Sequence, residues 1–218
     1  MIIAEYLSKE IFPLAENSSI QEAERQIVDF RLTHLPVVKD GKLLGSLNSR
    51  EIQGLNSNEL IKNHWVELEK FSLSGEADLF DAFPIFSEYE ANIIPVLDKE
   101  EKYIGVLLSE DIIYKVADFP FITEFGAYLT LTTPIQKYSI SEIANIVESN
   151  NGKILGLMLV GYNENKAVIA LKVSIEHLKS IGDAFERYGY RISNKYWEDS
   201  KQELLRDRFK QLQKFIEV

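Results

Sequence analysis

The first half of the sequence contains two copies of one unit, arranged in tandem. Each copy has a Pro-Val pair inside an apolar run, Leu35–Val38 in copy one and Ile94–Leu97 in copy two. Pro36 and Pro95 are 59 residues apart (95 − 36). The apolar residues ahead of each run recur at the same spacing, Ile20 with Leu79 and Ala23 with Ala82. Such a period predicts two units that bury their apolar faces against each other.

A glycine and an acidic residue follow each Pro-Val pair at a fixed spacing. Gly45 precedes Glu51 by six residues, and Gly105 precedes Asp111 by six residues. Copy two has one additional turn residue, so the offset between the copies becomes 60 at this point. The two acids therefore occupy equivalent positions.

The apolar spacing within each copy predicts a helix, a hairpin and a second helix. Ser19 can cap the first helix, with Glu22 placed to complete a capping box. Asp40-Gly41 between apolar runs is a strong hairpin signal. The remaining predicted elements are second helices from Ser49 to Leu55 and from Ser109 to Val116, and short leading strands at Ile11–Leu14 and Lys70–Leu73.

Composition narrows the function classes. The 218 residues have a formal net charge of −10, which disfavours nucleic acid as a direct partner. There is no cysteine, which excludes thiol catalysis, disulfides and thiolate zinc sites. The N-terminal residues lack an export signal and no apolar run can span a bilayer, so we expect a cytoplasmic protein without membrane contact.

These residues resemble the paired CBS domain, a tandem module named for cystathionine β-synthase. The resemblance rests on Leu7-Ser8, on LPVVKDGKLLGSLNSRE from residue 35, and on IPVLDKEEKYIGVLLSED from residue 94. It implies one repeat over residues 1–60 and a second over 61–118.

Members of that family bind adenosine-containing ligands in a cleft between the repeats, so the resemblance implies a regulatory ligand such as AMP, ADP or ATP and no required cofactor. An acid bonds the ribose hydroxyls, a Thr position reaches the sugar or phosphate, and apolar atoms near the Pro-Val strand hold the adenine. The implied site residues are the acids Asp111 and Glu51, the Thr positions Leu108 and Asn48, and the apolar residues Ile94, Pro95, Leu35 and Pro36.

Two interpretations of this site stay open. Asp111 favours nucleotide sensing, because a carboxylate can accept two hydroxyl hydrogen bonds. Leu108 and Asn48 depart from Thr and favour a protein-interaction module whose cleft is empty. Both acids could also simply stabilise the first turns of their own helices through the macrodipole.

The second half predicts a different domain. A strand over Gly126–Thr132, a helix capped by Ser139, a hairpin of Ile154–Tyr162 with Ala167–Val173, a helix over Ser174–Arg187 and a strand over Tyr190–Ser193 give the order β-α-β-β-α-β. After a CBS pair, this ferredoxin-like order over residues 125–195 resembles the ACT domain. The whole layout is similar to bacterial CBS-ACT proteins of the acetoin-utilisation type.

The tail and the repeats suggest self-association. A helix is predicted over residues 198–218, with a narrow apolar seam from Leu205 to Ile216 that either packs on the neighbouring sheet or contacts a second copy. We expect a homodimer, since two-fold dimers are the commonest soluble oligomers. The predicted interface consists mainly of the repeat helices that include Ile52 and Ile112.

No catalytic pattern emerges from the sequence. His34, His64 and His177 have no metal-ligand spacing and are predicted at the surface or at strand edges. No phosphate-binding glycine loop or nucleophile elbow is present. The fold class is therefore α/β (α+β), and the predicted function is non-enzymatic regulation, with an unidentified protein target as a further candidate partner.

Overall fold

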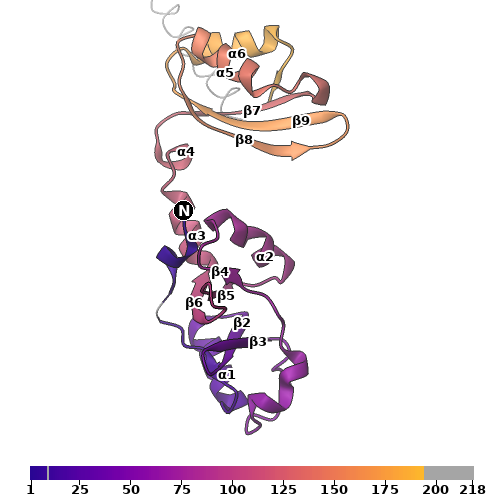
Figure 1. The fold of residues 1–218 in the computed structure, drawn as a ribbon. Coiled ribbons are helices and arrows are strands. Elements are labelled where there is room, and N and C mark those ends of the chain that lie inside the picture. Colours follow the sequence, from indigo (N-terminus) through magenta and orange to yellow (C-terminus); the bar gives the residue numbers. More distant parts are fainter. Residues whose placement is uncertain (9, 194–218) are drawn as a thin grey trace, which may run out of the picture. The chain divides into compact units, whose positions relative to one another are not determined.

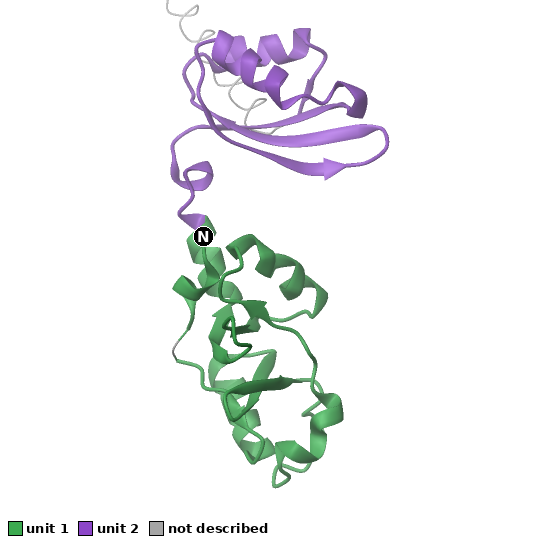
Figure 2. Cartoon of the chain, viewed as in Figure 1, with its two compact units in different colours: residues 1–116 green, residues 117–218 purple. Residues whose placement is uncertain are grey.

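The computed structural model describes residues 1–8 and 10–193. The chain divides into two compact units, residues 1–116 and 117–218 (Figures 1 and 2). The predicted helix over residues 198–218, with its apolar seam, lies outside the described residues.

Unit 1 contains both copies of the repeat, and each copy forms a three-stranded sheet. The sheets have the orders β1-β2-β3 and β4-β5-β6, with a parallel first pair and an antiparallel hairpin. Copy one comprises η1 (Ile3–Tyr6), β1 (Leu14–Ala15), α1 (Ile20–Phe30), β2 (His34–Lys39) and β3 (Lys42–Asn48). Copy two comprises η2 (Ile61–Glu67), β4 (Leu73–Ser74), η3 (Leu79–Asp81), α2 (Ala82–Glu88), β5 (Ile93–Leu97), β6 (Tyr103–Leu108) and α3 (Ser109–Ala117).

Local sequence explains where these elements begin and turn. Ser19 Oγ accepts a hydrogen bond from Glu22 N at 3.2 Å, which satisfies one free amide at the start of α1 as predicted. Asp40 and Gly41 both have positive φ angles, +49° and +77°, which a tight hairpin turn requires. The short leading strands begin later than predicted, at Leu14 and Leu73.

The predicted helix from Ser49 to Leu55 is wrong, because this stretch consists of turns. Ile52 O accepts from Leu55 N at 3.0 Å, a spacing of three residues rather than four. Gly54 has a φ of +100°, which an α-helix cannot contain. The equivalent stretch of copy two has no glycine and forms α3. Ile52 is 3% exposed and Ile112 of α3 is 1% exposed, so neither side chain is available for the predicted homodimer interface.

Each copy donates its leading segment to the other copy. We call residues 1–8 and 59–69 the leader segments. Ile3 N donates to Ala77 O at 3.1 Å, and Ile61 N donates to Ser18 O at 3.0 Å. The two hydrogen bonds are equivalent, because Ile61 follows Ile3 by 58 residues (61 − 3) and Ala77 follows Ser18 by 59 residues (77 − 18), close to the period of the repeat. Ile3 is fully buried in the core of copy two, and Ile61 is fully buried in that of copy one.

The leader segments cross the hairpins at their glycines. Gly45 has a φ of +149°, and a Cβ there would lie 2.8 Å from the Leu68 Cβ. Gly105 has a φ of +152°, and a Cβ there would lie 3.3 Å from Leu7 Cδ1. The two repeated glycines therefore permit both the backbone conformation and the close approach of the exchanged leader.

Unit 2 confirms the predicted order of elements. Its antiparallel sheet has the order β10-β7-β9-β8, and both long helices lie on one face (Figure 1). The core joins Leu131 and Ile169 of the sheet to Ile143 and Phe185 of the helices. The elements are α4 (Pro120–Thr123), β7 (Ala127–Pro134), η4 (Ile135–Lys137), α5 (Ile140–Ser149), β8 (Ile154–Tyr162), β9 (Lys166–Val173), α6 (Leu178–Arg187) and β10 (Arg191–Ile192).

One predicted helix start in unit 2 is wrong. The second helix begins at Leu178 rather than Ser174, because Ser174 Oγ accepts from Lys153 N at 3.0 Å and His177 has a left-handed φ of +64°. Ahead of the sheet, α4 begins with Pro120 in its first turn, where the missing N–H of proline is not needed.

A buried lysine fixes α4 to the sheet. Lys172 is 2% exposed, and its Nζ donates to Ile122 O at 3.0 Å while lying 4.6 Å from the Tyr128 ring centroid. Tyr128 OH donates to Phe121 O at 2.7 Å. Along their strands, Lys172 and Tyr128 alternate with core residues and therefore point to the opposite face of the sheet. α4 accordingly lies on the face that α5 and α6 do not cover.

The exchange of leader segments predicts unequal costs for two glycine substitutions. Gly45→Ala should lower the free energy of unfolding by about 3 kcal/mol, because it adds a collision with the leader to an unfavourable φ. Gly41→Ala is the matched control, since its φ is positive but no atom lies within 4 Å of the added Cβ; its cost should be about 1 kcal/mol. Urea denaturation measures both, and equal losses would contradict the packing argument.

Candidate functional site

The two repeats meet at an equivalent pair of polar residues. Thr33 precedes β2 and Asn92 precedes β5, and they are 59 residues apart (92 − 33). Thr33 N and Thr33 Oγ1 each donate to Asn92 Oδ1 at 2.9 Å, and Asn92 N donates to Thr33 Oγ1 at 2.9 Å. Asn92 Nδ2 also donates to Arg31 O at 2.8 Å. This network holds the ends of β2 and β5 together and sets the geometry of both predicted half-sites.

The Thr position of the copy-one half-site is engaged by other groups of the protein. Asn48, at the Thr position, donates from Nδ2 to Glu69 Oε1 at 2.8 Å. Its Oδ1 accepts from Arg50 N at 2.9 Å. Glu51 is exposed on the turn that replaces the predicted helix. The side-chain amide of Asn48 is thus already engaged at both ends, and the Glu51 carboxylate is not held toward it.

A buried histidine, predicted at the surface or at a strand edge, lies beside Asn48. His34 is 1% exposed, its Nδ1 lies 2.9 Å from Thr33 Oγ1, and its Nε2 lies 3.4 Å from Glu69 Oε2. The ring meets Phe71 edge-on at 5.3 Å. Burial lowers the pKa of His34, with the Glu69 carboxylate opposing this effect. The histidine is therefore held in its neutral form.

The copy-two half-site differs because its acid has no partner within residues 1–8 and 10–193. Asp111 lies in the first turn of α3 and is half-buried. Burial is the main cause that raises the pKa of Asp111, and the neighbouring carboxylates of Glu110 and Glu10 act in the same direction. Among the described residues, none donates a hydrogen bond to this carboxylate or pairs with it as a cation. Leu108, which ends β6 beside it, is half-buried.

The four predicted apolar residues lie in the two hairpins rather than around one cavity. Leu35 and Ile94 are fully buried in the cores of copy one and copy two. Pro36 and Pro95 are buried on the opposite strand faces, paired with Ser46 and Val106. The structure thus brings Leu108 near Asp111 and Asn48 near Glu51, as two separate half-sites.

A cleft of about 640 Å³ opens at the other end of the hairpins. None of the eight predicted residues lines it. Its apolar lining is Leu43, Leu44, Phe71, Ile85 and Leu97, with Tyr89 stacked on Phe71, and its charged lining is Lys42, Lys70, Glu88, Glu100 and Glu101.

Sequence reasoning missed His34 and Glu69 as site residues. An alignment of the two copies indicates His34 as unusual, because this polar residue occupies the position of Ile93 in copy two. Glu69 follows Leu68 as Ser8 follows Leu7, so its place on the exchanged leader becomes apparent only once the leaders are aligned. Within residues 1–8 and 10–193, no three His, Cys, Asp or Glu side chains are grouped to hold a metal ion.

Comparison with a family model identifies the repeats. The model described as the CBS domain matches residues 3–55 and 68–118, one match for each copy. Unit 1 is therefore a tandem CBS domain pair, as the resemblance implied. None of the helices in the described residues has the length and apolar character needed to cross a membrane.

Curated relatives match about half of the chain. An uncharacterised protein of Methanocaldococcus jannaschii is 22% identical over 112 residues, covering 51% of this chain and 42% of that protein. A homoserine O-acetyltransferase of Methanococcus vannielii is 29% identical over 117 residues, covering 51% of this chain and 24% of that protein. This chain thus spans less than half the length of these relatives.

Solved structures are similar over about half of the chain. A CBS domain pair/ACT domain protein from Thermotoga maritima is 16% identical with a TM-score of 0.49, covering 54% of this chain and 98% of that chain. A CBS domain pair in complex with 5′-methylthioadenosine and S-adenosyl-L-methionine is 25% identical with a TM-score of 0.44, covering 53% and 99%. At these TM-scores the likenesses add no argument to the family match.

The buried His34 predicts a specific pH dependence. Its pKa is lowered in the folded state, so below about pH 6.5 the unfolded chain binds the proton more readily and stability falls. His34→Ile, which installs the copy-two residue, should flatten the loss of stability between pH 8 and pH 5.5. Urea denaturation at the two pH values measures this difference.

The matched control is His177→Asn, because Asn tolerates the left-handed backbone at that position. This variant should retain the slope of the natural chain. An unchanged slope in His34→Ile would show that His34 does not carry the effect.

Proposed function

We propose that this chain is a non-enzymatic regulatory protein whose CBS pair binds an adenosine-containing ligand against Asp111. The ferredoxin-like unit contributes to assembly. The observation that carries the proposal is the half-buried carboxylate of Asp111, which has no partner among the described residues. We also propose that the whole layout is similar to that of CBS-ACT proteins of the acetoin-utilisation type, a similarity that rests on the order of the elements alone.

The chemistry of Asp111 fits a ribose. Removing a carboxylate from water without supplying a hydrogen-bond donor is unfavourable. Burial is accordingly the main cause that raises the pKa of Asp111. Two adjacent ribose hydroxyls can supply two hydrogen bonds to its two oxygens. Ligand binding would then favour the ionised form, so affinity should fall as the pH is lowered through the raised pKa.

The contrast with copy one supports a single ligand site. Asn48 is held by Glu69 and by the amide of Arg50, so a ligand would have to break both hydrogen bonds. Glu51 lies exposed on a turn. We therefore place the ligand at the copy-two half-site, with Leu108 supplying apolar contact.

The interaction-module alternative has its own support. Leu108 cannot hydrogen-bond a sugar or a phosphate, and the 640 Å³ cleft at the hairpin tips lies away from Asp111. On this alternative no adenosine compound binds, and the CBS pair presents its surface to a protein target.

Ligand titration separates the two functions. AMP, ADP, ATP or S-adenosylmethionine at a hundred times its Kd should add about 2.7 kcal/mol of stability and raise the Tm by several degrees. Asp111→Asn should abolish this shift, because the ribose loses its charged acceptor. Glu51→Gln is the matched control and should leave the shift unchanged. No shift with any of the four compounds at millimolar concentration would sink the sensor proposal.

A further inference from the structure

Three polar side chains project from one face of the copy-one sheet. The β2–β3 hairpin pairs His34 with Asn48 and Pro36 with Ser46. An isolated bridge then pairs Ser46 with Glu69 of the leader segment over residues 59–69. Residues directly opposite each other across strands point to the same side of a sheet, and so do residues two apart along one strand. The side chains of His34, Ser46 and Glu69 are therefore neighbours on one face.

Two of these three side chains are buried with an unused polar atom. His34 is 1% exposed and Ser46 is fully buried. His34 Nε2 and Ser46 Oγ have no hydrogen-bond partner among the described residues. Burying a polar atom without a partner is unfavourable, so two such atoms side by side indicate a site for a further group. The side chain of Glu69 is 32% exposed, which leaves a path to this site from solvent.

The hydrogen bonds around Thr33 determine which ring nitrogen of His34 carries the proton. The Thr33 hydroxyl donates its one proton to Asn92 Oδ1 at 2.9 Å and accepts from Asn92 N. Asn92 Nδ2 donates to Arg31 O, which fixes the orientation of the Asn92 amide. Thr33 Oγ1 can then only accept from His34 Nδ1, 2.9 Å away. The network thus assigns the proton of the neutral ring to Nδ1 and a lone pair to Nε2.

The lone pair of His34 Nε2 faces a second acceptor. Glu69 Oε2 lies 3.4 Å from Nε2, which is longer than the roughly 2.7–3.2 Å of an N–H···O hydrogen bond. Two acceptors do not attract each other, whereas a cation held by both atoms is favourable. Ligands about 2.0–2.1 Å from one tetrahedral Zn²⁺ lie about 3.3 Å from each other. The separation between His34 and Glu69 therefore fits two ligands of one metal ion.

The outer hydrogen bonds also match a metal site. A metal-bound histidine usually donates its other N–H to a protein acceptor, and here His34 Nδ1 donates to Thr33 Oγ1. A metal-bound carboxylate is usually hydrogen-bonded in turn, and Glu69 Oε1 accepts from Asn48 Nδ2 at 2.8 Å. Burial lowers the pKa of His34, which favours the neutral ring that a metal requires.

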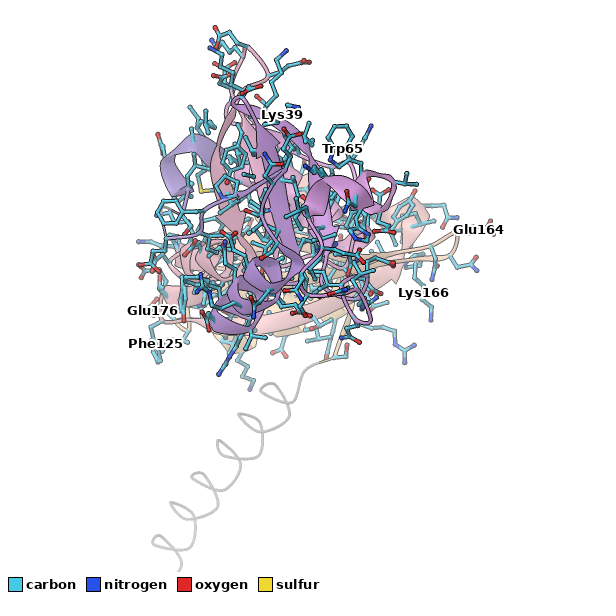
Figure 3. All side chains as sticks on the ribbon, turned by 90° about the horizontal axis from the view of Figure 1, so that it is seen from below. Lys39, Trp65, Phe125, Glu164, Lys166 and Glu176 are labelled. Carbon is cyan, nitrogen blue, oxygen red and sulfur yellow. The ribbon has the colours of Figure 1, made fainter. Side chains whose placement is uncertain are left out.

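The leader segment holds Glu69 in place at two points. Ser46 N donates to Glu69 O at 2.8 Å, and Glu69 N donates to Ser46 O at 2.9 Å. Four residues earlier, the ring of Trp65 lies 5.9 Å from Lys39 Nζ at the end of β2, and Figure 3 shows these two side chains near each other. The carboxylate is thus positioned by the backbone around it, which lowers the cost of binding an ion.

We infer that His34, Ser46 and Glu69 form a binding site for a divalent transition-metal cation such as Zn²⁺. His34 Nε2 and Glu69 Oε2 are the two strong ligands, the Ser46 hydroxyl is a third, and water completes the coordination. With two strong ligands the site binds more weakly than a four-ligand structural site. The metal joins copy one to the exchanged leader, so it stabilises the exchange. It does not depend on a ligand at Asp111, and the two proposals fail independently.

Calorimetry of the full chain with Zn²⁺ at about pH 7.5, after treatment with a chelator, tests the site. We expect one Zn²⁺ per chain, with no competing thiolate because the chain has no cysteine. His34→Ile should abolish this binding, and Glu69→Gln should raise the Kd at least about tenfold, because an amide lacks the carboxylate charge. His64→Asn is the matched control and should keep the natural Kd. Both ring nitrogens of His64 already lie 2.8 Å from carboxylates, those of Glu59 and Glu67.

Two further measurements separate lost ligands from lost folding. Zn²⁺ at about a hundred times its Kd should raise the Tm of the natural chain by several degrees, and should leave the Tm of a His34→Ile variant with native circular dichroism unchanged. In ¹⁵N-labelled protein, Zn²⁺ should shift the Nε2 resonance of His34 while Nδ1 stays protonated. No saturable Zn²⁺ binding to the natural chain would overturn the inference. So would binding that is lost in His64→Asn but kept in His34→Ile, or a neutral His34 ring with its proton on Nε2.

Discussion

The exchange of leader segments between the two copies is the constraint on which the rest of unit 1 depends. Ile3 completes the core of copy two and Ile61 completes the core of copy one, and neither copy contains a substitute for the donated side chain. The crossing over Gly45 and Gly105 leaves no room for a Cβ at the first position and little at the second. The pair therefore folds as one cooperative body, because removing either leader exposes the core of the other copy.

Within this symmetric frame, the two half-sites have become chemically different. Copy one has His34 and Asn48 at the positions that Ile93 and Leu108 occupy in copy two. Glu69, on the exchanged leader, accepts a hydrogen bond from Asn48. Copy one thus engages the side-chain amide of Asn48 within the protein, while copy two retains an acid that no described residue satisfies. Polar groups that are hydrogen-bonded within the protein favour stability over ligand binding. A buried carboxylate without a hydrogen-bond donor favours ligand binding over stability.

The sequence predicted much of the fold, for reasons that individual elements make clear. Duplication located both hairpins, and the cap at Ser19 located α1, since each depends on local spacing. The helix over residues 49–55 was predicted wrongly because serine capping and apolar spacing took no account of the left-handed Gly54. Neither the leader exchange nor the contact between Asn48 and Glu69 could be predicted, because both join residues distant in sequence whose alignment depends on the packed repeats.

The leader exchange also gives the proposed ligand a route to affect the whole pair. Asp111 belongs to copy two, but Glu10, whose charge acts on it, follows the leader of copy one. A ligand bonded to Asp111 would therefore lie within electrostatic reach of Glu10, which follows the leader that completes copy two. Its binding free energy would stabilise the exchange rather than a single repeat.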